Sequence, residues 1–134
     1  MNEEYAFSVR TRVAFSDTDA QGVVYYGRYN PYFDLARAEW LRTLGLLHRG
    51  SGEAEFVMRA NDVEYFAPAR FDDEIEIHVR ARFGRTSMTF EFAAFKVPEE
   101  TLLVTAHQTL VFIDRATRRP IPIPDDYREP FGVD

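Results

Sequence analysis

Residues 15–45 read FSDTDAQGVVYYGRYNPYFDLARAEWLRTLG, and this stretch decides the fold. From Tyr29 onward the apolar residues recur at every third or fourth position, which is the spacing of one face of an α-helix. Asn30 and Pro31 suit the N-cap and first residue of that helix, and Gly45 suits its end. The sequence therefore predicts one long helix, to which residues 23–26 could add an earlier turn.

Residues on both sides of this helix alternate between apolar and polar, which is the pattern of half-buried strands. The first such segment is 7–15, with Phe7, Val9, Val13 and Phe15 on one face. After the helix come four more segments, of which the first has an imperfect alternation that indicates a bulge and the last is apolar on both faces. They are residues 56–66, 75–83, 87–97 and 102–113.

The order of these elements is strand, helix and four strands in hairpin sequence, which predicts an α+β fold with one antiparallel sheet. We expect a single domain over residues 1–134. The segment 115–134 holds four of the seven prolines and is expected to be a surface extension. One helix cannot cover a sheet of five strands, so we also expect a homo-oligomer that buries the remaining apolar surface.

Composition removes several classes of function. The net charge of −6 argues against a nucleic-acid partner, which needs a broad basic surface. Without cysteine there is no thiol nucleophile, disulfide or thiolate metal site. The acidic start does not have the pattern of a signal peptide, and no apolar run is long enough to span a membrane, so we expect a cytoplasmic protein. The three histidines lie far apart without metal-ligand spacing, so no metal is expected.

Two carboxylates, Asp17 and Asp19, stand directly before the apolar run that starts at Val23. Aspartate is common in turns and at helix starts, where its side chain accepts hydrogen bonds from backbone N–H groups. Alternatively, one of the two carboxylates faces a pocket as a nucleophile or base. We assign the turn role to Asp17.

The motif Asp-x-Asp-x-x-Gly-x-Val resembles the signature of the 4-hydroxybenzoyl-CoA thioesterase family of hotdog-fold proteins, which includes thioesterases associated with the Tol-Pal system. The likeness continues along the chain in VEY at 63–65, PAR at 68–70 and GRTS at 84–87. It implies a hotdog fold, in which a curved antiparallel sheet wraps one long helix. It also implies an acyl-CoA thioesterase that uses no cofactor, because the coenzyme A thioester is its substrate, and that forms a dimer or tetramer.

Residue by residue, the resemblance places the catalytic carboxylate on Asp19 and an oxyanion-binding backbone N–H on Tyr26. Around them it implies an acyl site in which Gly22 lets the backbone approach the ligand. The other residues of that acyl site would be Val23, Tyr25 and Tyr29. For the phosphates of coenzyme A it points to the turn after Phe83, with the candidates Arg82, Arg85, Thr86 and Ser87.

Two other functions remain open at this point. A hotdog hydratase or dehydratase would need a histidine beside the acid to move protons between adjacent carbons, and no histidine lies near Asp19 in the sequence. A protein that binds acyl-CoA without hydrolysing it would use the same pocket.

Overall fold

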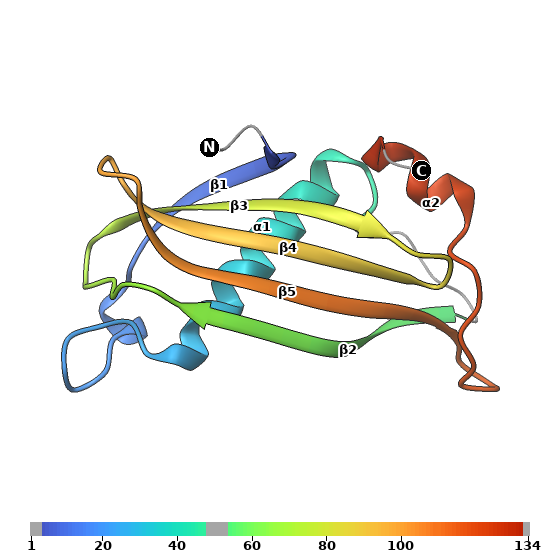
Figure 1. Cartoon of the computed structure of the whole chain (residues 1–134), viewed down its shortest axis with the longest axis horizontal. Coiled ribbons are helices and arrows are strands. Elements are labelled where there is room, and N and C mark those ends of the chain that lie inside the picture. The colour runs from blue at the N-terminus through green and yellow to red at the C-terminus, as the bar shows by residue number, and fades with distance from the viewer. Residues whose placement is uncertain (1–3, 48–53, 133–134) are drawn as a thin grey trace.

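The computed structural model describes residues 4–47 and 54–132. Its five strands form one antiparallel sheet in the order β1-β3-β4-β5-β2, so that β4 lies in the middle and β1 and β2 form the edges. The strands are β1 (Phe7–Arg12), β2 (Ala54–Tyr65), β3 (Glu74–Phe83), β4 (Ser87–Val97) and β5 (Thr101–Asp114). The helix α1 (Tyr29–Thr43) crosses one face of this long, curved sheet (Figure 1). This is the predicted hotdog arrangement.

The helix follows the predicted apolar spacing but begins two residues earlier than Pro31. A 3-10 turn, η3 (Tyr26–Arg28), leads directly into it, and Arg28 is the N-cap residue. Pro31 therefore lies within the first helical turn, where its missing N–H costs nothing because that position needs no partner inside the helix. Gly45 follows the last turn with φ +75°, a conformation that glycine adopts without strain.

The core lies between α1 and the inner face of the sheet. Phe33 and Ala36 of the helix are fully buried, and the Phe33 ring stacks on Phe92 of β4 at 4.9 Å between centroids. On β3 the inward residues Ile75, Ile77 and Val79 are completely buried. The alternation seen in the sequence thus separates this inner face from the polar outer face.

The bulge predicted in the second strand is confirmed, since the register of β2 against β5 shifts between Met58 and Ala60. The expected position of Phe15 is wrong. It was assigned to the buried face of the first strand, but β1 ends at Arg12 and Phe15 opens a 3-10 turn, η2 (Phe15–Asp17), with 77% of its surface exposed.

The C-terminal segment is not the surface extension that its prolines suggest. It forms a short helix, α2 (Asp125–Arg128), and a 3-10 turn, η4 (Glu129–Phe131), which lie against one end of the sheet (Figure 1). The Phe131 ring is buried against Trp40 at 5.0 Å and Phe83 at 5.2 Å. Arg128 and the Ile123 N–H donate hydrogen bonds to backbone oxygens of the β3–β4 turn. The segment therefore completes the core and holds that turn.

This packing predicts that Phe131→Ala destabilises the protein by about 2–4 kcal/mol, because it deletes a buried ring and leaves a cavity beside Trp40. The free energy of unfolding from urea denaturation measures the effect. As a control, Phe15→Ala removes an exposed ring and should change it by less than about 0.5 kcal/mol. If both variants lost equally little unfolding free energy, the C-terminal segment would be a surface extension and not part of the core.

Candidate functional site

Two loops meet at the N-terminal end of α1 and form the framework of the site. The loop that leaves β1 and the loop between β2 and β3 pair through an isolated β-bridge between Val23 and Arg70. The Val24 N–H also donates to the Ala69 oxygen at 2.8 Å, and both residues are buried. These backbone contacts fix the motif stretch against the start of β3.

Asp17 is buried and joins the first loop to the helix. Its Oδ2 accepts hydrogen bonds from the Tyr32 hydroxyl at 2.6 Å and from the Ala14 N–H at 3.0 Å. Its Oδ1 faces the Arg28 guanidinium at 3.2 Å, and its backbone oxygen accepts from the Tyr25 N–H at 3.0 Å. The assignment of Asp17 to a structural role agrees with these contacts, although it anchors three segments and not one turn.

Burial acts to raise the pKa of Asp17, but the hydrogen bonds from Tyr32, Ala14 and Arg28 outweigh it and leave the pKa below its ordinary value. On the partner side, burial and the Asp17 carboxylate raise the pKa of Tyr32 far above that of a free tyrosine. Asp17 is therefore ionised and Tyr32 protonated at neutral pH, which suits an anchor and not a proton-transfer group.

Asp19 lies at the exposed tip of the same loop, in a turn that it closes itself. Its Oδ1 accepts from the Gln21 N–H at 2.8 Å and, weakly, from the Val23 N–H at 3.5 Å. Its backbone oxygen accepts from the Gly22 N–H at 3.0 Å. These bonds fix one oxygen of the carboxylate, while Oδ2 receives no hydrogen bond from the part of the chain that the structure describes.

The backbone conformation of Gly22 explains why this residue is glycine. Its φ is +81°, which favours glycine, while a Cβ built on it would meet nothing within 4 Å. The turn conformation requires the residue. Gly22 is also absent from the lining of the cavity that opens beside this turn.

Tyr26 opens η3 directly before α1. Its backbone N–H donates to no group among residues 4–47 and 54–132, as is usual for the first amides of a helix. The helix dipole adds partial positive charge there, so this amide is suited to hold an oxyanion.

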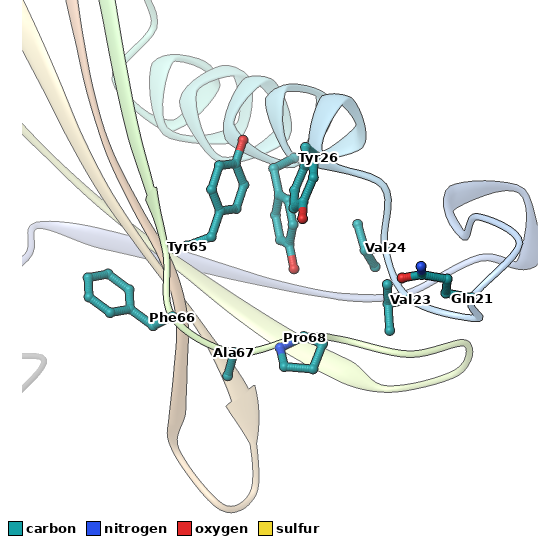
Figure 2. Close-up of a pocket in the computed structure, with 9 residues that line it drawn as sticks. Gln21, Val23, Val24, Tyr26, Tyr65, Phe66, Ala67 and Pro68 are labelled. Atoms are coloured by element: carbon teal, nitrogen blue, oxygen red, sulfur yellow. The ribbon is translucent and has the colours of Figure 1, made fainter.

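A cavity of about 390 Å³ opens between this helix start and the end of β2. Figure 2 shows the side chains around it, with Tyr26 and Val24 on one side and Tyr65 and Pro68 on the other. Aromatic and aliphatic groups dominate the lining, as expected for an acyl site. The lining residues are Gln21, Val23, Val24, Tyr26, Tyr29, Tyr65, Phe66, Ala67 and Pro68.

The sequence pointed to three of these lining residues, namely Val23, Tyr26 and Tyr29. It missed the opposite wall, which the β2 end and its following loop supply. The motif fragments VEY and PAR were visible there, but nothing in them indicated that they face Val23. Tyr25, predicted to bind the acyl group, is exposed and does not line the cavity, although its ring lies 6.2 Å from that of Tyr26.

The four residues predicted to bind phosphate lie at the other end of the sheet. They lie in or beside the β3–β4 turn and are Arg82, Arg85, Thr86 and Ser87. The Asp19 loop, in contrast, is bridged to the residues before β3. β3 has ten residues, so the two regions are separated by about 30 Å. Within a single chain the structure does not bring them together.

The two described histidines lie outside the cavity. His78 is on the outer face of β3, where its Nε2 is 2.8 Å from Glu76, and His107 is on the outer face of β5, 3.2 Å from Glu91. Both residues face away from α1, because their neighbours Ile77, Val79 and Ala106 belong to the core. His48 lies outside the described residues.

Comparison with known proteins gives matches over most of the chain. Residues 13–131 match the model of the thioesterase-like superfamily. The chain belongs to this family. It is 38% identical to the acyl-CoA thioester hydrolase YbgC of Escherichia coli O6:H1 over 120 residues, which cover 84% of this chain and 86% of the relative. The acyl-CoA thioesterase YbgC of Haemophilus influenzae is 31% identical, with 93% of each chain covered.

Solved structures of thioesterases share the fold. A 1,4-dihydroxy-2-naphthoyl-CoA thioesterase from Synechocystis superposes with a TM-score of 0.88 over 94% of this chain and 95% of its own, at 21% identity. A probable thioesterase from Bartonella henselae is 33% identical, with a TM-score of 0.77 over 89% of this chain and 100% of its own. Among the described residues, no helix is long and apolar enough to cross a membrane.

The Asp17 anchor predicts a specific dependence of stability on acid. Because its pKa is lower in the folded protein than in the unfolded chain, its contribution is present above about pH 4 and is lost as the pH falls through the folded value. Asp17→Asn should cost about 1–3 kcal/mol at pH 7. The difference in unfolding free energy between parent and variant should then shrink below about pH 4.

Urea denaturation at several pH values measures this difference. Glu76 and Glu91 also have lowered pKa values, so only the difference between the two proteins isolates Asp17. A difference that stays constant down to pH 2.5 would contradict the anchoring role.

Proposed function

We propose that this protein is an acyl-CoA thioesterase that hydrolyses a small acyl-CoA to the free acid and coenzyme A. The observation that carries the proposal is the position of the cavity between the Asp19 turn and the Tyr26 N–H. The amides of Gln21 and Val23 donate hydrogen bonds to the Asp19 carboxylate. Both residues line the cavity, and so does Tyr26. The identity to relatives named acyl-CoA thioester hydrolases supports the same reaction.

In this proposal the thioester carbonyl lies beside Tyr26, whose backbone N–H and helix dipole stabilise the negative charge on the carbonyl oxygen. Asp19 acts in one of two ways. It attacks the carbonyl carbon and forms a mixed anhydride that water then hydrolyses, or it takes a proton from the water that attacks. In both routes the coenzyme A thiolate leaves and water supplies the new acid oxygen. Neither route uses a metal or a cofactor.

A hydratase or dehydratase needs a histidine beside the acid, and the two histidines among the described residues, His78 and His107, lie on the outer face of the sheet. A non-catalytic acyl-CoA-binding protein would use the same cavity. The Asp19 carboxylate argues for hydrolysis, since it keeps an oxygen without a partner in a turn whose neighbours line the acyl site.

The functional unit that we propose is a homodimer that joins two copies through the β2 edge. β2 has twelve residues and ends the sheet. Its inward side chains Met58 and Tyr65 are 48% and 46% exposed, which is unusual for the core face of a strand. Pairing β2 with β2 of a second copy would extend the sheet and cover these side chains. A tetramer would contain two such dimers.

This dimer would also complete the site. Two β2 strands that pair around a twofold axis perpendicular to the sheet are antiparallel, so each subunit is reversed relative to the other. The partner's β3–β4 turn then lies at the end of the sheet where this chain carries Asp19. Arg85 of one copy would bind the phosphates of coenzyme A while Asp19 of the other acts on the thioester. We expect the protein to act in the cytoplasm.

Asp19→Asn tests the catalytic assignment. The amide oxygen can still accept the hydrogen bond from the Gln21 N–H, but the charge that both routes need is gone. We expect kcat to fall by about 10²–10⁴ with little change in the melting temperature. The matched control is Asp72→Asn, an exposed aspartate in the left-handed conformation, which asparagine tolerates. Full turnover in Asp19→Asn would remove Asp19 from the mechanism.

Mixing two inactive or impaired variants tests the shared site. Arg85→Glu should raise KM for acyl-CoA more than it lowers kcat, because the phosphates bind equally in the ground and transition states. A heterodimer of Arg85→Glu with Asp19→Asn contains one site in which both Asp19 and Arg85 are intact. Refolding an equal mixture should restore about a quarter of the parent activity at low substrate concentration.

If Asp19 and Arg85 of the same copy formed each site, neither site of the heterodimer would be intact and the mixture would gain nothing. A monomer mass by light scattering at micromolar concentration would also contradict the dimer.

A further inference from the structure

The Tyr65 ring forms one end of the acyl cavity. It projects from the last residue of β2 toward the first turn of α1 (Figure 2). Its centroid lies 4.9 Å from that of Tyr26 and 5.8 Å from that of Tyr29, with both pairs of rings tilted. Three tyrosine rings thus meet where the helix approaches the strand, and the cavity ends against them.

Beyond Tyr65 the inner face of β2 continues toward the middle of the strand. Three residues of β2 pair with β5 residues that are buried on the side that faces α1. Tyr65 pairs with Val104, Val63 with Ala106 and Asn61 with Gln108. Val63 is small and only partly buried. The next inward residue, Asn61, donates a hydrogen bond from Nδ2 to Oδ1 of Asn30 on α1 at 3.2 Å. This polar bridge joins the helix to the strand beyond Val63.

Tyr29 cannot give way as readily as Tyr65. It is 3% exposed, and its hydroxyl is held by a hydrogen bond with the Ala69 backbone. Burial raises the pKa of Tyr29 to about 12, so it stays neutral. Tyr65 is 46% exposed, and its hydroxyl has no hydrogen-bond partner within the described ranges. Of the two rings, Tyr65 is the one whose size can be changed without breaking an internal hydrogen bond.

We infer that Tyr65 determines the specificity of this site by setting the longest acyl group that it accepts. An acyl chain that starts at Tyr26 meets the Tyr65 ring. Removal of this ring would open the inner face of β2 beside Val63. The new limit would then be the Asn30–Asn61 hydrogen bond, because an apolar chain cannot replace it. The inference rests on the proposed function, because it concerns the acyl group of the same thioester.

Tyr65→Val removes the ring and keeps a side chain that suits a strand. Tyr65 and Val63 are about 7 Å apart along β2, so we expect the preferred acyl length to increase by up to about five carbons. Beyond the parent limit, kcat/KM should rise by about fourfold for each methylene that becomes buried. Each value is expressed relative to hydrolysis of acetyl-CoA by the same variant, which separates the length profile from the overall rate.

Three further variants separate the ring from other effects. Tyr65→Phe keeps the ring and should keep the parent length profile. Tyr65→Trp enlarges the ring and should shorten the longest accepted acyl group, which tests the inference even if the valine variant does not fold. Phe15→Val is the matched control, because it removes another exposed ring that neither lines the cavity nor belongs to β2. Its profile should equal that of the parent.

The experiment measures thiol release from a series of straight-chain acyl-CoAs, together with calorimetric binding of the corresponding non-hydrolysable thioethers. A valine variant that folds and retains the parent length profile, or a tryptophan variant without a shorter limit, overturns the role of Tyr65. Binding profiles that shift as expected without thiol release from any protein support the role of Tyr65 and overturn the proposed hydrolysis. Thiol release with an unshifted length profile would support the proposed hydrolysis and overturn the role of Tyr65.

Discussion

The carboxylate of Asp17 is the contact on which the site depends. It is buried, and it holds together the exit of β1 through Ala14, the turn before the helix through Arg28 and the helix itself through Tyr32. A buried carboxylate that lost these donors would carry an uncompensated charge, which costs several kcal/mol. The loop therefore has one arrangement relative to α1. The Asp17 contacts thereby fix the positions of the Tyr26 amide and of the Asp19 turn.

We propose that the two aspartates of the motif have different roles, structural for Asp17 and chemical for Asp19. Asp17 has all of its strong acceptor positions occupied and is shielded from solvent, whereas Asp19 is at the surface with only one oxygen fixed. This difference follows from their positions two residues apart. The first carboxylate points back under the loop, and the second lies in the turn that leads to the cavity. A site that needs a positioned but available carboxylate gains both properties from this pair.

Periodicity in the sequence was enough to predict the helix, the strands and the antiparallel order, because burial on one face leaves a direct trace in the residue pattern. The signal failed where contacts are not periodic. Phe15 continued the strand pattern by chance, and the prolines after Arg115 concealed the packing of Phe131 against Trp40. Each error concerned a segment whose position depends on distant residues.

The candidate site was predicted in part for the same reason. Local sequence could place Asp19, Val23, Tyr26 and Tyr29 near one another, since the chain connects them within a few residues. Tyr65 and Pro68 could not be added, because their position across the cavity depends on the bridge between Val23 and Arg70. The distance between Asp19 and the turn at Arg85 could be estimated only after this bridge placed the Asp19 loop beside the residues that precede β3.

We propose that this cavity supports hydrolysis and not only binding. The most direct measurement is isotopic: the parent protein is incubated with acyl-CoA in ¹⁸O-labelled water, and the released acid is analysed by mass spectrometry together with the rate of thiol formation. We expect one ¹⁸O in the acid, a stoichiometric thiol and repeated turnover above the uncatalysed rate. Saturable binding of acyl-CoA without acid release above that background would contradict it.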